Sequence, residues 1–125
     1  MKAYLIQSGS AGTTLELRET PAPQPGPGQL LVRVRAASLN RGEFIRAVGL
    51  TKPGAPKPAG SDGAGEVEGT GARVMGRLPG SFAEYALMDA KDAIPVPPNL
   101  SWAEAAAVPI SFLVVYDMLV PQGRL

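Results

Sequence analysis

The side chains that most often carry acid–base, nucleophilic or metal chemistry are scarce in this chain. Its 125 residues include no histidine and no cysteine. Imidazole and thiolate are the usual ligands of tetrahedral zinc, and they also supply the commonest general base and a strong nucleophile. We therefore expect no zinc site, no disulfide, no cysteine nucleophile and no histidine base, so that any chemistry is metal-free.

Pairs of carboxylates are the remaining candidates for acid–base work. The close pairs are Asp62 with Glu66 and Asp89 with Asp92. Catalysis by two carboxyl groups needs surroundings that separate their pKa values, and the sequence places no such partner beside either pair. The pattern predicts solvated surface charge.

Glycine-rich runs could cradle a phosphate, but their setting argues against it. The run GSDGAG at residues 60–65 and GTG at residues 69–71 are not set between a strand and a helix, which a dinucleotide-binding turn requires. Residues 8–14 lack the lysine of a phosphate-binding P-loop. We interpret all three runs as turn and strand glycines.

Composition limits the class of protein further. A mass of 13.0 kDa and 45% hydrophobic residues are typical of one folded domain. The net charge is +1 and no basic run forms a stripe, so nucleic acid is not an expected partner. The N-terminus enters a strand pattern without a signal-like or membrane-spanning apolar stretch. We expect a cytoplasmic protein with no membrane partner, because the lack of cysteine fits a reducing compartment.

Proline and glycine, 13 and 15 residues respectively, separate short apolar segments and predict a mostly β domain with short helices. In the strand expected at residues 30–37, Leu30, Val32, Val34 and Ala36 should share one inward face, with Leu31, Arg33 and Arg35 on the other. The other expected strands span residues 1–7, 14–19, 62–68, 73–77 and 81–88. The proline-rich residues 21–28 and 52–59 should be connectors, since proline cannot donate to a sheet.

Two capping-box patterns predict where helices begin. In each, an Asn or Ser caps the helix and a Glu three residues later reaches back to the cap amide. Asn40 with Glu43 opens a short helix expected to run through Val48, and Ser101 with Glu104 opens a turn through Ala107. Pro109 should begin a further helix to about Val120.

Five ordered segments together resemble the medium-chain dehydrogenase/reductase superfamily, and more narrowly its zinc-independent quinone oxidoreductases. They are AASLNR at residues 36–41, PAGSDGAGEV at 58–67, RVMG at 73–76, GSFAEY at 80–85 and AAAVP at 105–109. The resemblance implies the N-terminal GroES-like domain, a partly open β-barrel that carries much of the substrate pocket. It covers nearly the whole chain.

The same resemblance places the missing zinc ligands. In the zinc-dependent relatives a cysteine stands at the position matching Asn40, and a histidine at the position matching Ser61. The cysteine-rich lobe that holds a structural zinc in those relatives is also missing between Arg77 and Gly80. These substitutions imply the zinc-free branch, which reduces a quinone or activated alkene with hydride from NADPH.

The resemblance also implies which side chains approach the nicotinamide and the substrate. Asn40 and Glu43 would lie near the cofactor, as would Ser111 and Val114 on the later helix, and Ile45 and Thr51 would line the substrate pocket. Asn40 and Glu43 also have the capping-box interpretation, and the two roles can coexist. For Ile45, Ser111 and Val114 the alternative is ordinary packing in the core.

Two departures from the family divide the interpretation of function. The hairpin at residues 68–73 is shorter than in the family, and no glycine-rich strand–turn–helix follows residues 109–125. We expect a GroES-like domain at residues 1–108 and a junction helix at 109–125 that normally leads into a nucleotide-binding domain. Either the chain is the substrate-side domain of such a reductase, binding no NADPH alone, or it is a stand-alone noncatalytic scaffold or binding module. The apolar residues 109–120 predict self-association.

Overall fold

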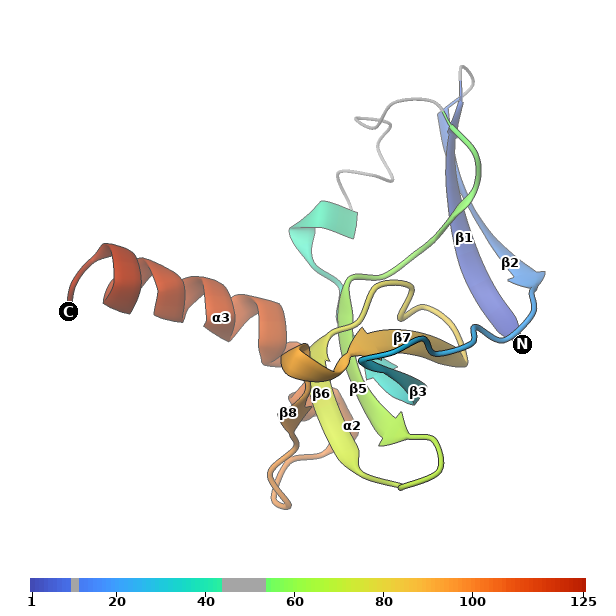
Figure 1. Ribbon diagram of the computed structural model, residues 1–125. Helices are drawn as coiled ribbons and strands as arrows, with labels where there is room; N and C mark the ends of the chain where they lie inside the picture. Colours follow the sequence, from blue (N-terminus) through green and yellow to red (C-terminus); the bar gives the residue numbers. More distant parts are fainter. Residues whose placement is uncertain (10–11, 44–53) are drawn as a thin grey trace.

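Figure 1 shows the computed structural model of the chain, which describes residues 1–9, 12–43 and 54–125. Two antiparallel sheets and short helices make up these residues, as the sequence predicts. The smaller sheet has the order β2-β1-β4, and the larger has the order β7-β3-β5-β6-β8. Their bounds are Lys2–Gly9 for β1, Gly12–Glu19 for β2, Gln29–Ala37 for β3, Lys57–Pro58 for β4, Asp62–Val67 for β5, Arg73–Arg77 for β6, Tyr85–Asp89 for β7 and Ile94–Pro95 for β8.

The hairpin of β1 and β2 extends from the body of the molecule and is joined to the larger sheet at its base (Figure 1). A bridge between Ala3 and Ala83 makes the joint, together with hydrogen bonds from the Tyr4 amide to the Phe82 carbonyl and from the Glu84 amide to the Lys2 carbonyl. The two sheets thus form an open, barrel-like arrangement.

The strand expected at residues 81–88 begins only at Tyr85, so its first half is a wrong prediction. Residues 81–84 connect the two sheets instead of continuing one ladder, because their backbone groups are divided between partners. Phe82 donates to Ala59 and accepts from Tyr4.

The larger sheet buries side chains on both faces, which gives the domain two core clusters. One face carries Val32, Val67, Val74, Leu78, Ala86 and Met88. On the other face Ala64, Met75 and Val96 pack against Ala105 and Ala106, which belong to a helix. Because neighbouring residues on a strand point to opposite faces, each cluster draws on alternate positions of β5 and β6.

A β-bulge in β3 changes the face that its last residues occupy. Val34 is paired with Gly65, but Ala36 is already paired with the next residue, Ala64, so one extra residue is inserted in β3. Val34 accordingly packs on the first core cluster and Ala36 on the second. The expectation of a single inward face from Leu30 to Ala36 is therefore wrong beyond Val34. The bulge turns the end of β3 towards the helix side of the sheet.

The glycines of β5 permit a close approach to β3, which confirms their interpretation as strand glycines. A Cβ atom on Gly65 would lie 2.2 Å from the Arg33 carbonyl oxygen, and one on Gly63 would lie 2.7 Å from that of Ala36. Both distances are well inside van der Waals contact. A side chain at either position would force β3 and β5 apart.

Helix α2, Trp102–Ala107, begins where the sequence predicts it. The Ser101 hydroxyl accepts the Glu104 amide at 3.3 Å, and the Glu104 carboxylate accepts the Ser101 amide at 2.8 Å, so the capping box is complete. The Arg73 guanidinium stacks 4.4 Å from the centre of the Trp102 ring and donates to the Leu100 carbonyl. These contacts fix the start of α2 on the second core cluster. A short 3₁₀ helix, η1, spans Ala90–Asp92.

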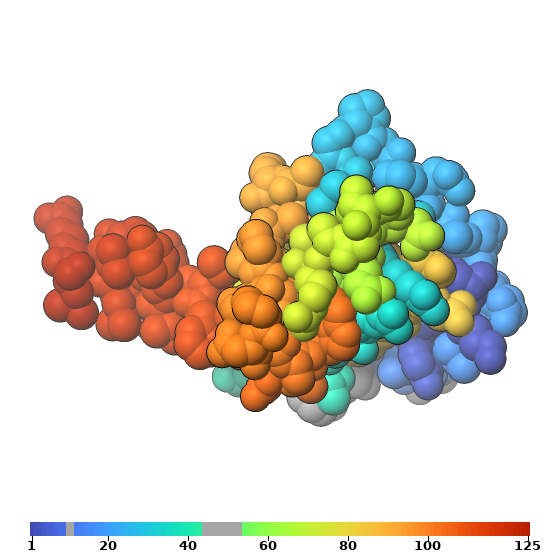
Figure 2. Space-filling model, turned by 90° about the horizontal axis from the view of Figure 1, so that it is seen from below, coloured from blue at the N-terminus to red at the C-terminus, as the bar shows by residue number. Residues whose placement is uncertain are grey.

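Helix α3, Pro109–Asp117, follows directly and continues as the π-helical turn η2, Met118–Gln122. It projects away from the sheets in both views (Figures 1 and 2). The exposed large apolar side chains on it are Phe112, Leu113, Val114, Val115, Tyr116, Met118, Leu119 and Val120. The helical stretch Trp102–Gln122, with a mean hydropathy of 1.7 over its most apolar window, is long and apolar enough to cross a membrane by length and composition. Core helices of soluble proteins meet the same criterion.

Candidate functional site

Asp62, the first residue of β5, is the most deeply buried charged residue among those described, with 1% of its surface exposed. The prediction that it belongs to a solvated surface pair is wrong. Its partner in that prediction, Glu66, instead forms a salt bridge with Arg35, with 2.8 Å between Nη2 and Oε2. Local sequence does not indicate the burial, because the residues that enclose Asp62 come from distant segments.

Three donors from two other segments converge on the Asp62 carboxylate. The Ser38 hydroxyl and the Asn40 side-chain amide both donate to Oδ1, the latter at 2.7 Å. The Ile110 backbone N–H donates to Oδ2 at 3.3 Å. Ile110 is the second residue of α3, whose first amides have no partner within the helix. A buried carboxylate is costly without such donors, so Asp62 joins the end of β3 to the start of α3.

The bulge in β3 places Ser38 and Asn40 on the same face of the sheet as Asp62. Beyond it, Ala36 is paired with Ala64 and Ala37 with Gly63. Continuing that register brings Ser38 opposite Asp62, on the same face. Without the extra residue, Ser38 and Asn40 would lie on the opposite face from Asp62.

Glu43 forms a second set of contacts beside the first. Its Oε2 accepts the Asn40 backbone amide at 2.8 Å, as the capping-box pattern predicts. Its Oε1 accepts the hydroxyl of Ser61. The other half of the predicted box does not form as expected: both hydrogen bonds of the Asn40 side chain run to Ser38 and Asp62. Glu43 therefore connects Asn40 and Ser61, the two positions at which the family resemblance places zinc ligands.

The remaining predicted site residues fall into two groups. Ser111 is exposed and Val114 is 51% exposed on α3, so neither is packed in the core of this chain. Ser111 follows Ile110, whose amide is held by Asp62, and this places the start of α3 beside Asn40. Ile45 and Thr51, with most of the helix expected through Val48, lie outside the described residues.

These residues do not match a zinc site. In the described part of the chain no three His, Cys, Asp or Glu side chains are grouped so as to hold a metal ion. The groups at this point are an amide, two hydroxyls and two carboxylates. Zinc in sites of this kind favours nitrogen and sulfur donors in a tetrahedron.

A complete dinucleotide site is also not formed by the described residues. The glycines at residues 60–65 lie in a turn and in β5, and Gly60 adopts φ +99° with Ser81 and Phe82 packed against it. A Cβ atom there would lie 2.3 Å from the Ser81 hydroxyl oxygen. This turn packs against protein and is not a phosphate cradle.

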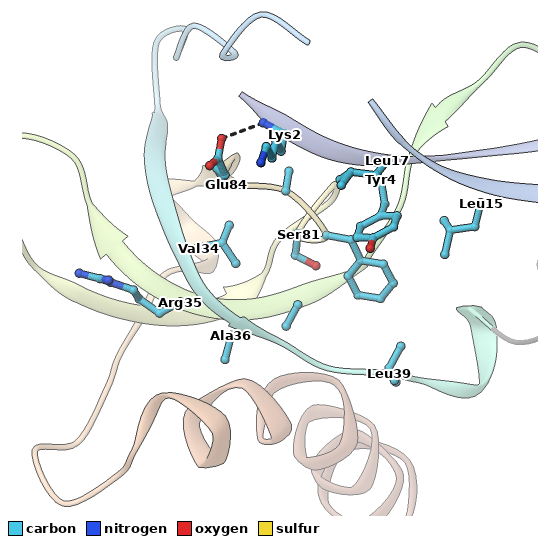
Figure 3. A pocket seen from close by; sticks show the side chains of 13 residues that line it. Lys2, Tyr4, Leu15, Leu17, Val34, Arg35, Ala36, Leu39, Ser81 and Glu84 are labelled. Atoms are coloured by element: carbon cyan, nitrogen blue, oxygen red, sulfur yellow. Dashed lines mark hydrogen bonds between the residues drawn. The ribbon is translucent and has the colours of Figure 1, made fainter. Parts of the chain in front are cut away.

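A groove of about 550 Å³ lies between the β1–β2 hairpin and β3 (Figure 3). Its apolar walls include Tyr4, Leu15, Leu17, Val34, Leu39 and Phe82. Leu39 lines this groove while its neighbour Asn40 is bonded to Asp62. At one end of the groove the Lys2 backbone amide donates to the Glu84 carboxylate at 2.7 Å. The groove could not be predicted from the sequence, since its walls come from four separate segments.

Comparison with known proteins supports the family that the sequence motifs resemble. The family model for the alcohol dehydrogenase GroES-like domain matches residues 26–76. A zinc-type alcohol dehydrogenase-like protein of Schizosaccharomyces pombe is 34% identical over 116 residues, and a trans-enoyl reductase of Pyricularia oryzae is 31% identical over 140 residues. The quinone oxidoreductase of Thermus thermophilus, solved alone and with NADPH, matches with a TM-score of 0.84 at 33% identity.

The matches cover most of this chain but less than half of each relative. They include 82%, 98% and 98% of this chain, and 36%, 39% and 41% of the S. pombe, P. oryzae and T. thermophilus proteins. The GroES-like match and these relatives agree with one another. The chain belongs to the medium-chain dehydrogenase/reductase family, through its alcohol dehydrogenase GroES-like domain.

Proposed function

We propose that this chain is the substrate-side domain of an NADPH-dependent, zinc-free reductase of quinones or enones, and that it does not act alone. The observation that supports this most directly is the cluster at the end of β3. There Asn40 and Ser61, which the family resemblance matches to zinc-ligand positions, are both hydrogen-bonded to Glu43. A quinone or enone already carries a polarised acceptor, so hydride transfer to it needs no Lewis acid.

NADPH, when bound, supplies the hydride. The residues of this chain that would touch it are Asn40 and Glu43 at the end of β3 and Ser111 and Val114 on α3. Asp62 holds the start of α3 to the sheet through the Ile110 amide, so these two groups of residues keep a fixed relation to each other. Positioning of this kind and exclusion of water are the protein's main contributions to such a reaction. Ile45 and Thr51 stay predicted substrate contacts.

The need for a second domain is supported by α3 itself. Its apolar side chains are exposed on every side, and the described part of this chain does not cover them. An apolar helix of this kind is ordinarily buried against a partner. In the proposed reductase the partner is a nucleotide-binding domain, and in its absence we expect the isolated chain to self-associate through residues 109–120.

The alternative function, a noncatalytic binding module, is supported by the groove between the hairpin and β3. It is apolar, open and large enough for a small organic molecule. It does not depend on Asn40, Ser61 or a nucleotide. Binding of quinones or enones to the isolated chain at Leu15 and Leu17, with no reductase activity in any assembly, would favour this alternative.

A chimera tests the proposed function. The chain, joined through its α3 helix to the NADPH-binding remainder of the T. thermophilus quinone oxidoreductase, should oxidise NADPH when a quinone or an enone is added. The isolated chain should bind no NADPH by calorimetry and should contain no stoichiometric zinc after dialysis. The T. thermophilus remainder alone is the control for the chimera.

Four results would count against the proposal. A folded chimera without NADPH oxidation would contradict the assignment to a reductase. Micromolar NADPH binding by the isolated chain would contradict its dependence on a second domain, and one equivalent of bound zinc would contradict the zinc-free assignment. Sedimentation of the isolated chain as a monomer with an ordered, exposed α3 would contradict self-association. A cytoplasmic location, without membrane or nucleic-acid partners, stays part of the proposal.

A further inference from the structure

The hydrogen bonds around Asp62 determine which end of the Asn40 amide faces outward. A carboxylate can only accept hydrogen bonds, so the group facing Asp62 must be a donor. The Asn40 Nδ2 atom lies 2.7 Å from Asp62 Oδ1 and 3.0 Å from the Ser38 hydroxyl oxygen. The Ser38 hydroxyl gives its one proton to Asp62 and can therefore accept from Nδ2. Both protons of the Asn40 amide are used inside the cluster.

The opposite end of the amide is an available acceptor. No hydrogen bond of the described residues uses Asn40 Oδ1. That atom is also not among the buried polar atoms without a partner, a set that holds only the Ser81 hydroxyl in the described part of the chain. Since Asn40 is half-buried, its oxygen is reachable from solvent. The reverse orientation would place two oxygen atoms 2.7 Å apart with no proton between them.

The hydroxyl of Ser61 and the backbone N–H of Asn40 also direct their protons into the cluster. The Ser61 hydroxyl donates its proton to Glu43, and the Asn40 backbone N–H donates to the other oxygen of the same carboxylate. The side-chain protons of Asn40 and Ser61 are thus all directed to Asp62, Ser38 or Glu43. What these two side chains can offer a ligand is lone pairs.

We propose that Asp62 is a positioning residue: it orients the Asn40 amide so that the cluster recognises a hydrogen-bond donor, a carboxamide NH₂ or a hydroxyl group, on the bound ligand. The assignment of that ligand to cofactor or substrate rests on the proposed function, but the polarity of the cluster rests only on this chain. One consequence is that Asn40 does not donate to the carbonyl oxygen of a quinone or enone. Any hydrogen bond to that oxygen must come from a group outside this cluster.

Matched probe pairs test the polarity on the chain itself. Nicotinamide carries an amide NH₂, whereas methyl nicotinate has the same ring with an ester and no donor. Hydroquinone and 1,4-dimethoxybenzene form the corresponding pair for a substrate hydroxyl. Shifts of the backbone amide signals of residues 38–43 and 61 measure binding by NMR. In at least one pair the donor-bearing probe should bind roughly tenfold tighter, because the acceptor-only probe leaves Asn40 Oδ1 without a partner.

Variants of Asp62 then separate positioning from simple structural support. In Asp62→Asn the new amide donates towards residue 40, Asn40 reverses, and its NH₂ faces outward. That NH₂ can donate to the carbonyl oxygen that both nicotinic probes carry, so the preference should disappear. The double variant Asn40→Asp with Asp62→Asn again places an acceptor outward, and the preference for nicotinamide should return. A purely structural role for Asp62 predicts no such return.

The outcomes divide clearly. The proposal is supported if the wild-type chain prefers the donor probe, Asp62→Asn loses this preference and the double variant restores it. A preference within the nicotinic pair assigns the contact to the cofactor. A preference within the phenolic pair assigns it to the substrate. Equal binding within both pairs, no binding of any probe, or unchanged preference in Asp62→Asn overturns the proposal. A chimera without reductase activity would contradict the proposed function and leave the probe result unaffected.

Discussion

Two segments of this chain carry the same four-residue pattern for a helix start, and the structure uses them differently. At Ser101 the pattern forms a complete capping box, in which side chain and backbone bond reciprocally with Glu104. At Asn40 only the Glu43 half forms, and the Asn40 side chain turns to Asp62, which is 22 residues away in the sequence. The first segment is a local structure and the second is a tertiary one.

The difference comes from burial and charge, not from the cap residues themselves. Ser101 and Glu104 are exposed, and among the described residues the Ser101 hydroxyl donates to the Glu104 carboxylate of the same capping box and to no distant group. Asn40 is half-buried next to a buried carboxylate that needs donors. A hydrogen bond to a charged group is stronger than one between neutral groups. The Asn40 side-chain amide therefore bonds to Asp62 and does not cap the helix, so Asn40 becomes part of the candidate site.

The largest expected effect follows from removing the distant carboxylate. Asp62→Ala leaves three buried or half-buried donors without their acceptor, so we expect a loss of about 3 kcal/mol in the free energy of unfolding. Glu66→Ala on the same strand breaks only the part-exposed salt bridge to Arg35 and should cost less than about 1 kcal/mol. Urea unfolding of both variants measures the difference. Equal losses would mean that Asp62 is no more important than an ordinary surface carboxylate.

Replacing the first residue of each pattern, Ser101 or Asn40, by aspartate is a second test of the difference between the two segments. Ser101→Asp should change stability by less than about 0.5 kcal/mol, because Asp caps helices as well as Ser. Asn40→Asp places a second carboxylate against Asp62, and two carboxylates so close cannot both ionise. We expect a loss of about 2 kcal/mol at neutral pH.

The loss of stability in Asn40→Asp should depend on pH. In Asn40→Asp the folded-state pKa of one carboxyl of the pair is raised above its unfolded value. Its contribution to stability is then present at low pH and is lost as the pH rises through that folded-state pKa. Thermal unfolding between acid and neutral pH should show the two variants converging towards acid. Parallel curves for the Asn40 and Ser101 variants would contradict the tertiary assignment.

Removal of the local cap should have an intermediate effect. Ser101→Ala leaves the Glu104 amide without its side-chain acceptor, and N-cap losses of this kind cost about 1 kcal/mol. The Glu104→Gln variant is a matched control, because Gln can still reach back to the Ser101 amide. Urea midpoints measure both. A loss for Ser101→Ala as large as that for Asp62→Ala would remove the distinction between the two segments.

The smallest effect is the titration of the local box. Hydrogen bonds from the Ser101 backbone amide and then from its hydroxyl lower the pKa of Glu104 below its ordinary value of 4.5. A carboxyl with a depressed folded-state pKa stabilises the fold above its unfolded pKa, and this contribution is lost as the pH falls through the folded-state value. Carboxyl-detected NMR should find Glu104 titrating below 4.5 in the wild type and closer to it in Ser101→Ala. An unchanged titration would contradict the cap assignment.

The sequence predicts the local parts of the structure and misses the tertiary ones. Strands, turns and the Ser101 cap depend on neighbours in the chain, and residues 62–67, 73–77 and 101–107 fold close to the predicted bounds. The resemblance to quinone oxidoreductases also identified the fold. The contacts of Asp62 with Ser38 and Asn40 could not be predicted, because they depend on one extra residue in β3 that changes the face of those two residues. Alternation along β3 predicted the opposite face for Ala36.

The most direct test of the role of Asp62 observes the Asn40 side-chain amide itself. If both of its protons are held by Asp62 and Ser38, their NMR signals should be shifted from those of exposed asparagines and should exchange slowly with water. In Asp62→Ala the same signals should move to ordinary positions and exchange rapidly, while the Ser101 cap is unaffected. Rapid exchange of the Asn40 side-chain protons in the wild-type chain would contradict the claim that Asp62 holds this amide.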